Sequence, residues 1–328
     1  MNNLNELKTK YINMIVTLLT VIAMAAFLHG PKVIELILVA VFTAVVVDFI
    51  IIKFKKQAFW KQYDFSFIIT AIIVTLALPA TAPLWMPVVG VLVALLVAKH
   101  PFGGVGRNIF NPAATGIAFL AISWSDIFFK YPLPLTNFGI DNQQKAQLFS
   151  ESSSSILSVG GTPSTNYFDI FFGRYAGPLG VTCMVLLACC LFYLWVRKTV
   201  KLSMVLPAIL VVTLFAIVMP RVVTGRIASV IHELSSGMFI FGIIFMASDP
   251  TTTPKLPLGR VLFSTMLGLM VVLFRRFGST EISFVYALLI MNALSTSLDK
   301  LAVQIMNFYR SHKTLRVQEN VEDGVINE

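Results

Sequence analysis

The chain has 328 residues, of which 57% are hydrophobic and 12% are charged. Soluble domains carry about twice that share of charged residues, so the composition excludes a soluble protein and favours a polytopic helical membrane protein. The net charge is +9, but the Lys and Arg residues form short clusters between apolar runs, which is the pattern that sets orientation in a membrane. We therefore expect a lipid membrane around this chain and no nucleic-acid partner.

Cysteine use and the N-terminus exclude two further features. Cys183, Cys189 and Cys190 lie in one apolar run without the spacing of a metal site, so we expect no metal. Residues 1–10 are polar, and no small-residue cleavage pattern follows the first apolar run, so we expect no cleavable signal peptide.

Five apolar runs occupy the first part of the chain. They are Ile12–Leu28, Val33–Ile52, Phe65–Leu78, Pro87–Ala98 and Ala113–Trp124. The first two are long enough to span a bilayer, whereas the third and fourth are short and are bounded by the proline at Pro79 and the glycine turn at Gly103. Short runs interrupted by Gly and Pro are typical of broken helices around a binding site.

A polar stretch from 125 to 175 separates these runs from five more. The later runs are Leu179–Val196, Leu202–Met219, Glu233–Ala247, Leu258–Phe274 and Ile282–Leu298. The third of them stops at Pro250 as the earlier one stops at Pro79, and Gly278 follows as Gly103 does. We therefore predict an all-α protein of about ten transmembrane helices, arranged as two inverted five-helix repeats with broken helices in matching positions.

The predicted repeats divide the chain into four regions. Residues 1–124 form the first membrane repeat, 125–175 an extracytoplasmic loop, 176–299 the second repeat and 300–328 a charged, partly disordered cytoplasmic tail. Most of the 25 Lys and Arg residues fall in segments that this arrangement places inside. The charge distribution thus predicts that both termini are cytoplasmic in a bacterial inner membrane.

The polar stretch centres on residues 158–164, SVGGTPS, where Thr162 stands between Gly160, Gly161 and Pro163. A hydroxyl on such a backbone is accessible to a modifying enzyme. The alternative is an ordinary external loop with a Gly-Pro turn.

A second group of polar residues lies at the broken helices: Arg107, Asn108, Asn111 and Asp249. Helix N-termini that follow the glycine turn suit an anion. The alternative is that Asn111-Pro112 and Asp249-Pro250 cap helix ends. Glu281 and Asn292 are candidates for an ion path, and for Asn292 the alternative is a hydrogen bond inside the bundle.

Four segments carry a resemblance to a known family. They are residues 78–86 (LPATAPLWM), 102–113 (FGGVGRNIFNPA), 172–180 (FGRYAGPLG) and 245–250 (FMASDP). In this order they resemble the D subunit of Rnf electron-transport complexes and the related B subunit of the sodium-pumping NADH:quinone reductase. The resemblance covers roughly residues 64–299.

The resemblance implies a covalent FMN, joined through its phosphate to an outer-face threonine by a separate flavin transferase. That threonine corresponds to Thr162. The family motif reads Asp-x-x-Ser/Thr-Gly-Ala-Thr, and this chain has Ile156, Val159 and Gly161 where the motif has its acid, hydroxyl and alanine. Ser164 and Thr165 are weaker alternative acceptors.

The resemblance also implies a second, non-covalent flavin (riboflavin or FMN) in the membrane core, for which Arg107, Asn108, Asn111 and Asp249 are the candidates. Arg174 is a candidate partner of a flavin phosphate, or else an interfacial arginine that extends its head group to water.

The function expected from these features is that of a membrane subunit of an ion-translocating, flavin-based oxidoreductase, which relays electrons together with other subunits and is coupled to Na⁺ or H⁺. No Gly-x-Gly-x-x-Gly follows a strand, so NADH binding falls to a partner. One alternative is a stand-alone electron relay to quinone or extracellular flavoproteins, and another is a flavin-free channel or transporter on the same fold.

Overall fold

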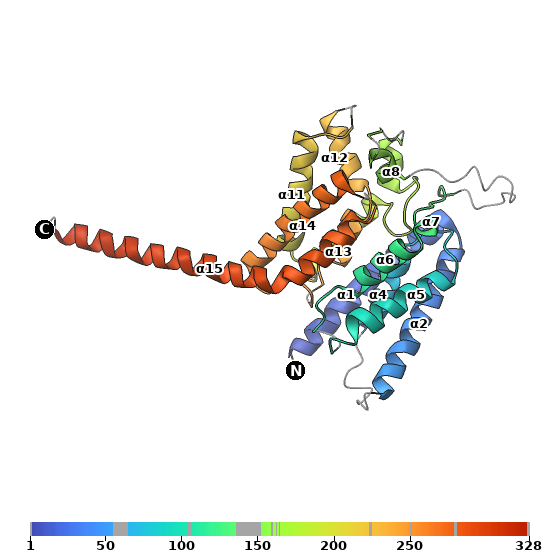
Figure 1. Cartoon of the computed structure of the whole chain (residues 1–328), viewed down its shortest axis with the longest axis horizontal. Coiled ribbons are helices and arrows are strands. Elements are labelled where there is room, and N and C mark those ends of the chain that lie inside the picture. Colours follow the sequence, from blue (N-terminus) through green and yellow to red (C-terminus); the bar gives the residue numbers. More distant parts are fainter. Residues whose placement is uncertain are drawn as a thin grey trace.

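The computed structural model describes residues 2–54, 65–103, 107–135, 152–158, 160–161, 163, 165–222, 225–249, 251–278 and 281–326. The regular elements of these residues are helices, as the composition predicts (Figure 1). Because a backbone in lipid must satisfy its own hydrogen bonds, helices are the expected solution for a chain this apolar.

The first half of the chain forms one helical group. Its helices are α1 (Asn2–His29), α2 (Lys32–Phe54), α4 (Ser66–Leu76), α5 (Trp85–Val93), the π-helix η1 (Ala94–Lys99) and α6 (Pro112–Ser123). Helix α2 packs on α4 and α5, and α6 packs on α4, α5 and η1. This group lies on one side of the molecule, apart from the later helices (Figure 1).

The second half forms the other helical group. Its helices are α10 (Met184–Val196), α11 (Leu202–Val218), α12 (Arg226–Ser235), α13 (Phe239–Phe245), α14 (Pro257–Phe277) and α15 (Ser283–Ile326). Here α11 packs on α12 and α14, and α15 packs on α13 and α14. The two groups meet where α1 contacts α10 and where α6 contacts α15.

Three short helices lie between the halves. They are α7 (Ser125–Phe128), α8 (Ser153–Ser158) and α9 (Tyr167–Phe172). Helix α8 lies near α12, at the end of the molecule away from the N-terminus (Figure 1). Helix α8 is joined to the second half by a hydrophobic contact of Leu157 with Val222 and Ala228.

Three helical segments are long and apolar enough to cross a bilayer: Glu6–His29, Lys32–Phe54 and Pro257–Phe277. The bent pair α12 and α13 would make a fourth, and five further apolar helices of the described chain have only 10–17 residues. The chain is therefore helical and has helices that can span a membrane, as predicted. The full count of ten spans stays a prediction.

The run expected to begin at Leu179 becomes helical only at Met184. The preceding segment is held instead by the end of α4, because the backbone N–H groups of Leu179 and Gly180 donate to the carbonyls of Leu78 and Leu76 at 3.1 and 2.8 Å. A Cβ at Gly180 would lie 2.8 Å from the Leu76 Cβ, so only glycine permits this approach. The bonds satisfy carbonyl groups that the end of a helix otherwise leaves open.

The run expected over Glu233–Ala247 is two helices, α12 and α13, which meet at an angle of 51°. The tail is also different from the expectation of partial disorder, because α15 continues as one helix to Ile326. From Lys300 to Asp323 the sequence has neither proline nor glycine, so nothing in it stops the helix.

Helices α5 and α6 touch backbone to backbone. A Cβ at Gly116 of α6 would lie 2.4 Å from the carbonyl oxygen of Gly90 in α5. Close approach through small residues is the usual way for helices to associate in a membrane, where lipid gives no hydrophobic drive for packing. This contact fixes α6, whose first residues form the site described next.

Candidate functional site

Three of the predicted core residues meet at one pocket. Asn108, Asn111 and Asp249 all line it, and it encloses about 670 Å³ of space not filled by protein, part of which is open to solvent. The pocket lies where α6 begins and α13 has just ended, so it joins the two halves of the chain.

Asn111 organises the wall of this pocket. Its side-chain oxygen accepts from the backbone N–H of Ala114 at 3.1 Å, which makes it the N-cap of α6. Its side-chain nitrogen donates to the Met246 carbonyl at 3.0 Å, and its backbone N–H donates to Oδ1 of Asn292 at 2.9 Å. The capping interpretation of Asn111 is therefore confirmed, and the same residue ties α6 to both α13 and α15.

Asn292 completes this network. Its Nδ2 donates to the Thr252 carbonyl at 3.3 Å, and the residue is buried. The hydrogen-bonding interpretation of Asn292 is thus confirmed. Glu281 lies elsewhere: it is buried, and its carboxylate accepts from the hydroxyl of Ser152.

Asp249 forms a turn after α13. One carboxylate oxygen accepts from the Thr251 N–H at 3.0 Å and the other accepts from the Thr251 hydroxyl at 2.9 Å. A side chain that bonds its own backbone two residues on is a standard turn former. Because the residue also lines the pocket, its negative charge faces any ligand that enters.

Arg107 is the predicted core residue that stands apart. Asn108 is buried in the pocket wall, but Arg107 is exposed and is not among the lining residues. A Cβ at Gly103 would lie 3.1 Å from the Cδ of Arg107, so the arginine chain runs beside that glycine. The structure brings together the amides and the acid but not the guanidinium.

Other lining residues carry no sequence motif that could have found them. The polar ones are Lys10, Ser66, Thr70, Thr199, Ser248 and Thr251, and the apolar ones include Tyr11, Met14, Ile69, Ile73 and Phe245. They come from segments far apart in the chain. Only the packing of α1 and α4 against the second half brings them to one place.

A buried ion cluster adjoins the first half's broken helix. Asp48 of α2 lies 3.7 Å from Lys99 Nζ and 3.1 Å from His100 Nε2, and Lys99 is only 2% exposed. The π-helix η1 ends at Lys99 and gives the chain its turn toward Asp48. Charges within a membrane segment are costly unless paired, and this pairing accounts for the acid that the sequence places in α2.

Thr162 lies outside the described residues. Of its neighbours, Gly160 is exposed with φ +76°, a conformation that favours glycine, and the Gly161 N–H donates to the Ile156 carbonyl at 2.9 Å. Arg174 is exposed just after the C-terminus of α9, so it is a surface residue on the same stretch of chain.

The pocket and helix α8 of the polar stretch lie at opposite ends of α11. Thr199 lines the pocket just before α11 begins, whereas Val222, which holds Leu157 of α8, follows its end. A helix of 17 residues is about 25 Å long. The pocket and α8 are therefore separated by most of the thickness of a bilayer core.

The pocket residues fit the polar edge and the flat face of an isoalloxazine ring. Asn108 and Thr251 offer donors and acceptors, Asp249 offers acceptors, and Tyr11 and Phe245 add aromatic wall.

The chain is similar in sequence to a known protein family and to several of its members. The family described as NQR2, RnfD, RnfE matches residues 1–307. The D subunit of the ion-translocating oxidoreductase complex of Haemophilus ducreyi is 28% identical over 310 residues, which cover 85% of this chain and 88% of that protein. The D subunit of the proton-translocating ferredoxin:NAD(+) oxidoreductase complex of Clostridium ljungdahlii is 29% identical over 287 residues, which cover 84% and 83%.

A third relative is similar over the same extent. The D subunit of the ion-translocating oxidoreductase complex of Actinobacillus succinogenes is 27% identical over 316 residues, covering 86% of this chain and 88% of that protein. By their names, these relatives are subunits of oxidoreductase complexes that translocate ions or protons. A match over nearly the whole length, together with the convergence of the predicted residues at one pocket, shows that the chain belongs to the NQR2, RnfD, RnfE family.

Proposed function

We propose that this chain is the D-type membrane subunit of an Rnf-type complex and relays electrons between two flavins on opposite faces of the membrane. One flavin is FMN, esterified to Thr162 by a flavin transferase. The other is a non-covalent flavin in the pocket lined by Asn108, Asn111 and Asp249. Coupling of this relay to Na⁺ or H⁺ movement and the NADH reaction involve the other subunits.

The observation that carries this proposal is the pocket at the junction of the halves. Residues from two broken helices, far apart in sequence, meet there around one pocket. Bound in it, a flavin would accept and pass on electrons. The amide of Asn111 and the carboxylate of Asp249 are already fixed by their own hydrogen bonds, so the site is preorganised.

The proposal includes a topology of ten spans in two inverted repeats, with both termini in the cytoplasm of a bacterial cell. The helix contacts support it, since α2 with α4 and α5 corresponds to α11 with α12 and α14. The contacts of α1 with α10 and of α6 with α15 join equivalent helices, as a two-fold axis between the halves requires.

The test is a flavin balance on the purified chain, produced together with its own flavin transferase. Acid precipitation separates extractable flavin from covalent flavin, and intact mass reports the modification. We expect a covalent population heavier by one FMN less a water, and an extractable flavin beside it. Thr162→Ala should remove the covalent fraction alone, whereas Thr165→Ala, a matched change three residues on, should keep it.

The covalent FMN and the non-covalent flavin can be disproved independently of each other. Loss of the mass shift in the wild-type chain would remove the covalent site and leave the pocket flavin standing. Absence of both flavin fractions would favour the flavin-free transporter instead. Full flavin content without any partner subunits in the cell would favour the stand-alone electron relay.

The orientation has its own test. Asn166→Cys, at an exposed position of the polar stretch, should react with a membrane-impermeant maleimide in whole cells. The wild-type chain, with its three native cysteines, is the control. Labelling of the introduced cysteine only after lysis would reverse the orientation and with it the outer-face flavin.

A further inference from the structure

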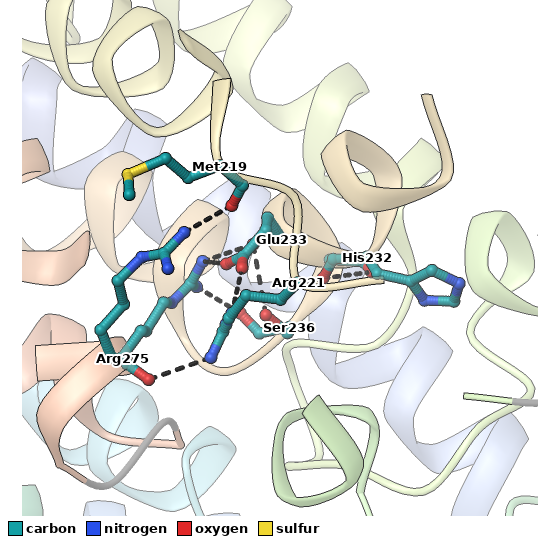
Figure 2. Close-up of polar contacts among 8 residues, drawn as sticks. Met219, Arg221, His232, Glu233, Ser236 and Arg275 are labelled. Atoms are coloured by element: carbon teal, nitrogen blue, oxygen red, sulfur yellow. Dashed lines mark hydrogen bonds and ion pairs between the residues drawn. The ribbon is translucent and has the colours of Figure 1, made fainter. Parts of the chain in front are cut away.

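A second charged enclosure lies at the other end of α14 from the flavin pocket. Glu233 of α12 accepts from Arg275 Nη1 at 2.8 Å and from Arg221 Nε at 2.5 Å (Figure 2). Arg275 also donates to the carbonyls of Glu233 at 2.6 Å and Ser236 at 2.8 Å. Figure 2 shows both guanidinium groups beside the one carboxylate.

The arginines have donors left over. Among the described residues, Arg275 Nε and Arg221 Nη2 are buried and have no hydrogen-bond partner. The whole Arg275 residue is only 2% exposed. A buried donor without an acceptor is destabilising, and more so when the group is charged. The arrangement therefore leaves guanidinium donors that the protein itself does not satisfy.

The charge in this enclosure is also unbalanced. Its lining contains Arg221, Arg275, Arg276 and Glu233, that is, three positive charges against one negative charge. Glu281 is not part of the lining, but its carboxylate, which accepts from Ser152, also attracts the Arg275 guanidinium; the three arginines still exceed the two carboxylates in charge. A net positive cluster in apolar surroundings is stable only with a counter-charge, so the missing acceptor should be an anion.

The enclosure opens toward the apolar surface of the bundle. It holds about 240 Å³ of empty space, and apolar residues of α11 and α14 complete its wall: Val212, Phe215, Ala216, Met219 and Val272. Met219 and Arg276 are exposed at its rim, next to the exposed Val218 and Phe277. Such side chains face lipid in a membrane protein, so a molecule that enters here has one charged end and an apolar body.

We propose that this enclosure, the arginine pocket, binds the phosphate of an anionic phospholipid. The phosphodiester oxygens accept from Arg221, Arg275 and Arg276, and an acyl chain lies along the α11–α14 surface. Guanidinium groups suit phosphate because their fork of donors matches its oxygens. Arg276 now donates to the Met219 carbonyl at the rim, a position from which it reaches a head group.

Two other sources of phosphate are distinguished by the apolar wall of the pocket. A free phosphate ion has no use for that wall. A flavin phosphodiester on the polar stretch would approach from the side of α8, which is docked on Val222 and Ala228, and it would leave the apolar residues of α11 and α14 uncovered. The lipid is the phosphate source that matches both the charge and the apolar surface.

The experiment is native mass spectrometry of the full chain, with lipid added in equal amounts. Phosphatidylglycerol is the probe and phosphatidylcholine, which has the same diester but a zwitterionic head group, is the reference. We expect phosphatidylglycerol to be retained about tenfold more strongly. Arg276→Gln should remove most of this preference, because one charge-assisted hydrogen bond corresponds to about a tenfold change or more.

Arg226→Gln is the matched control. Arg226 is exposed at the start of α12 on the same end of the molecule, but it is not part of the pocket lining. The same charge is lost, and the preference for phosphatidylglycerol should remain. Size-exclusion profiles establish that both variants are folded, and the wild-type comparison of the two lipids does not depend on any variant.

Three outcomes would overturn the proposal. Equal retention of the two lipids by the wild-type chain would exclude a phospholipid site, as would an equal loss of preference in Arg226→Gln. Displacement of phosphatidylglycerol by millimolar inorganic phosphate alone would assign the pocket to a soluble anion. Binding of phosphatidylglycerol that appears only in Thr162→Ala would assign it to the flavin phosphate instead.

Discussion

The proposed flavin pocket, lined by Asn108, Asn111 and Asp249 and called the flavin pocket below, and the arginine pocket lie at opposite ends of α14 and are built in different ways. Near the N-terminal end of α14 the groups are amides, hydroxyls, one carboxylate and the ammonium of Lys10, and Asn111, Asp249 and Asn292 are held by hydrogen bonds to backbone groups. At its C-terminal end the groups are guanidiniums gathered around Glu233. A helix of 21 residues places the two ends about 30 Å apart.

This difference shows two ways to keep polar groups in an apolar bundle. The flavin pocket is internally satisfied: Asn111 makes three hydrogen bonds and leaves its wall in place without a ligand. The arginine pocket keeps unused donors on Arg221 and Arg275. We therefore expect the first to depend on uncharged side chains and the second to depend on charge and on the surrounding lipid.

The largest effect should follow Glu233→Gln. The change keeps the shape but leaves Arg221 and Arg275 without their carboxylate, and removing one partner of a buried ion pair costs about 3–5 kcal/mol. Thermal unfolding in nanodiscs should show the loss, and it should be smaller in phosphatidylglycerol than in phosphatidylcholine. Glu35→Gln, at an exposed position of α2, should change stability by under about 1 kcal/mol.

Asn111→Ala should have the next largest effect. It removes the N-cap of α6 and the bond to the Met246 carbonyl, which together correspond to a loss of about 2–3 kcal/mol. The extractable flavin should fall with it. Asn166 stands at the N-cap of α9 without a side-chain bond, so Asn166→Ala should leave both the unfolding temperature and the flavin content unchanged.

Asp249→Asn should separate charge from structure. Asparagine can keep the turn with Thr251, so the free energy of unfolding should change by less than about 1 kcal/mol. Removing a negative charge beside the flavin favours the electron-rich reduced form, so its midpoint potential should rise. A retained flavin with an unchanged potential would place it away from Asp249.

The smallest effect should follow Arg107→Gln. The side chain is exposed beside Gly103 and does not line the pocket, so stability and the ratio of extractable flavin to protein should stay close to wild type. Asn108→Ala, one residue on and buried in the pocket wall, should lower that ratio clearly. An equal fall for both variants would return Arg107 to the flavin site.

Much of the site could be predicted because it follows from local sequence. Pro79, Gly103 and Pro250 interrupt apolar runs, and a backbone break in lipid requires polar groups nearby, which points to Asn108, Asn111 and Asp249. The same reasoning does not tell which charged residues face the ligand, because an arginine near a helix break can point to water as easily as to a ligand. The sequence pattern therefore groups Arg107 with residues from which the structure separates it.

The sequence by itself determined that this chain is a helical membrane protein with broken helices, because apolar run length and proline and glycine positions act within a few residues of the chain. The bend between α12 and α13, the late start of α10 and the uninterrupted α15 were decided by tertiary structure. So were both pockets, whose walls join α1 to α13 and α11 to α14. Contacts of this kind depend on which helices pack together, and no local pattern in the chain encodes that.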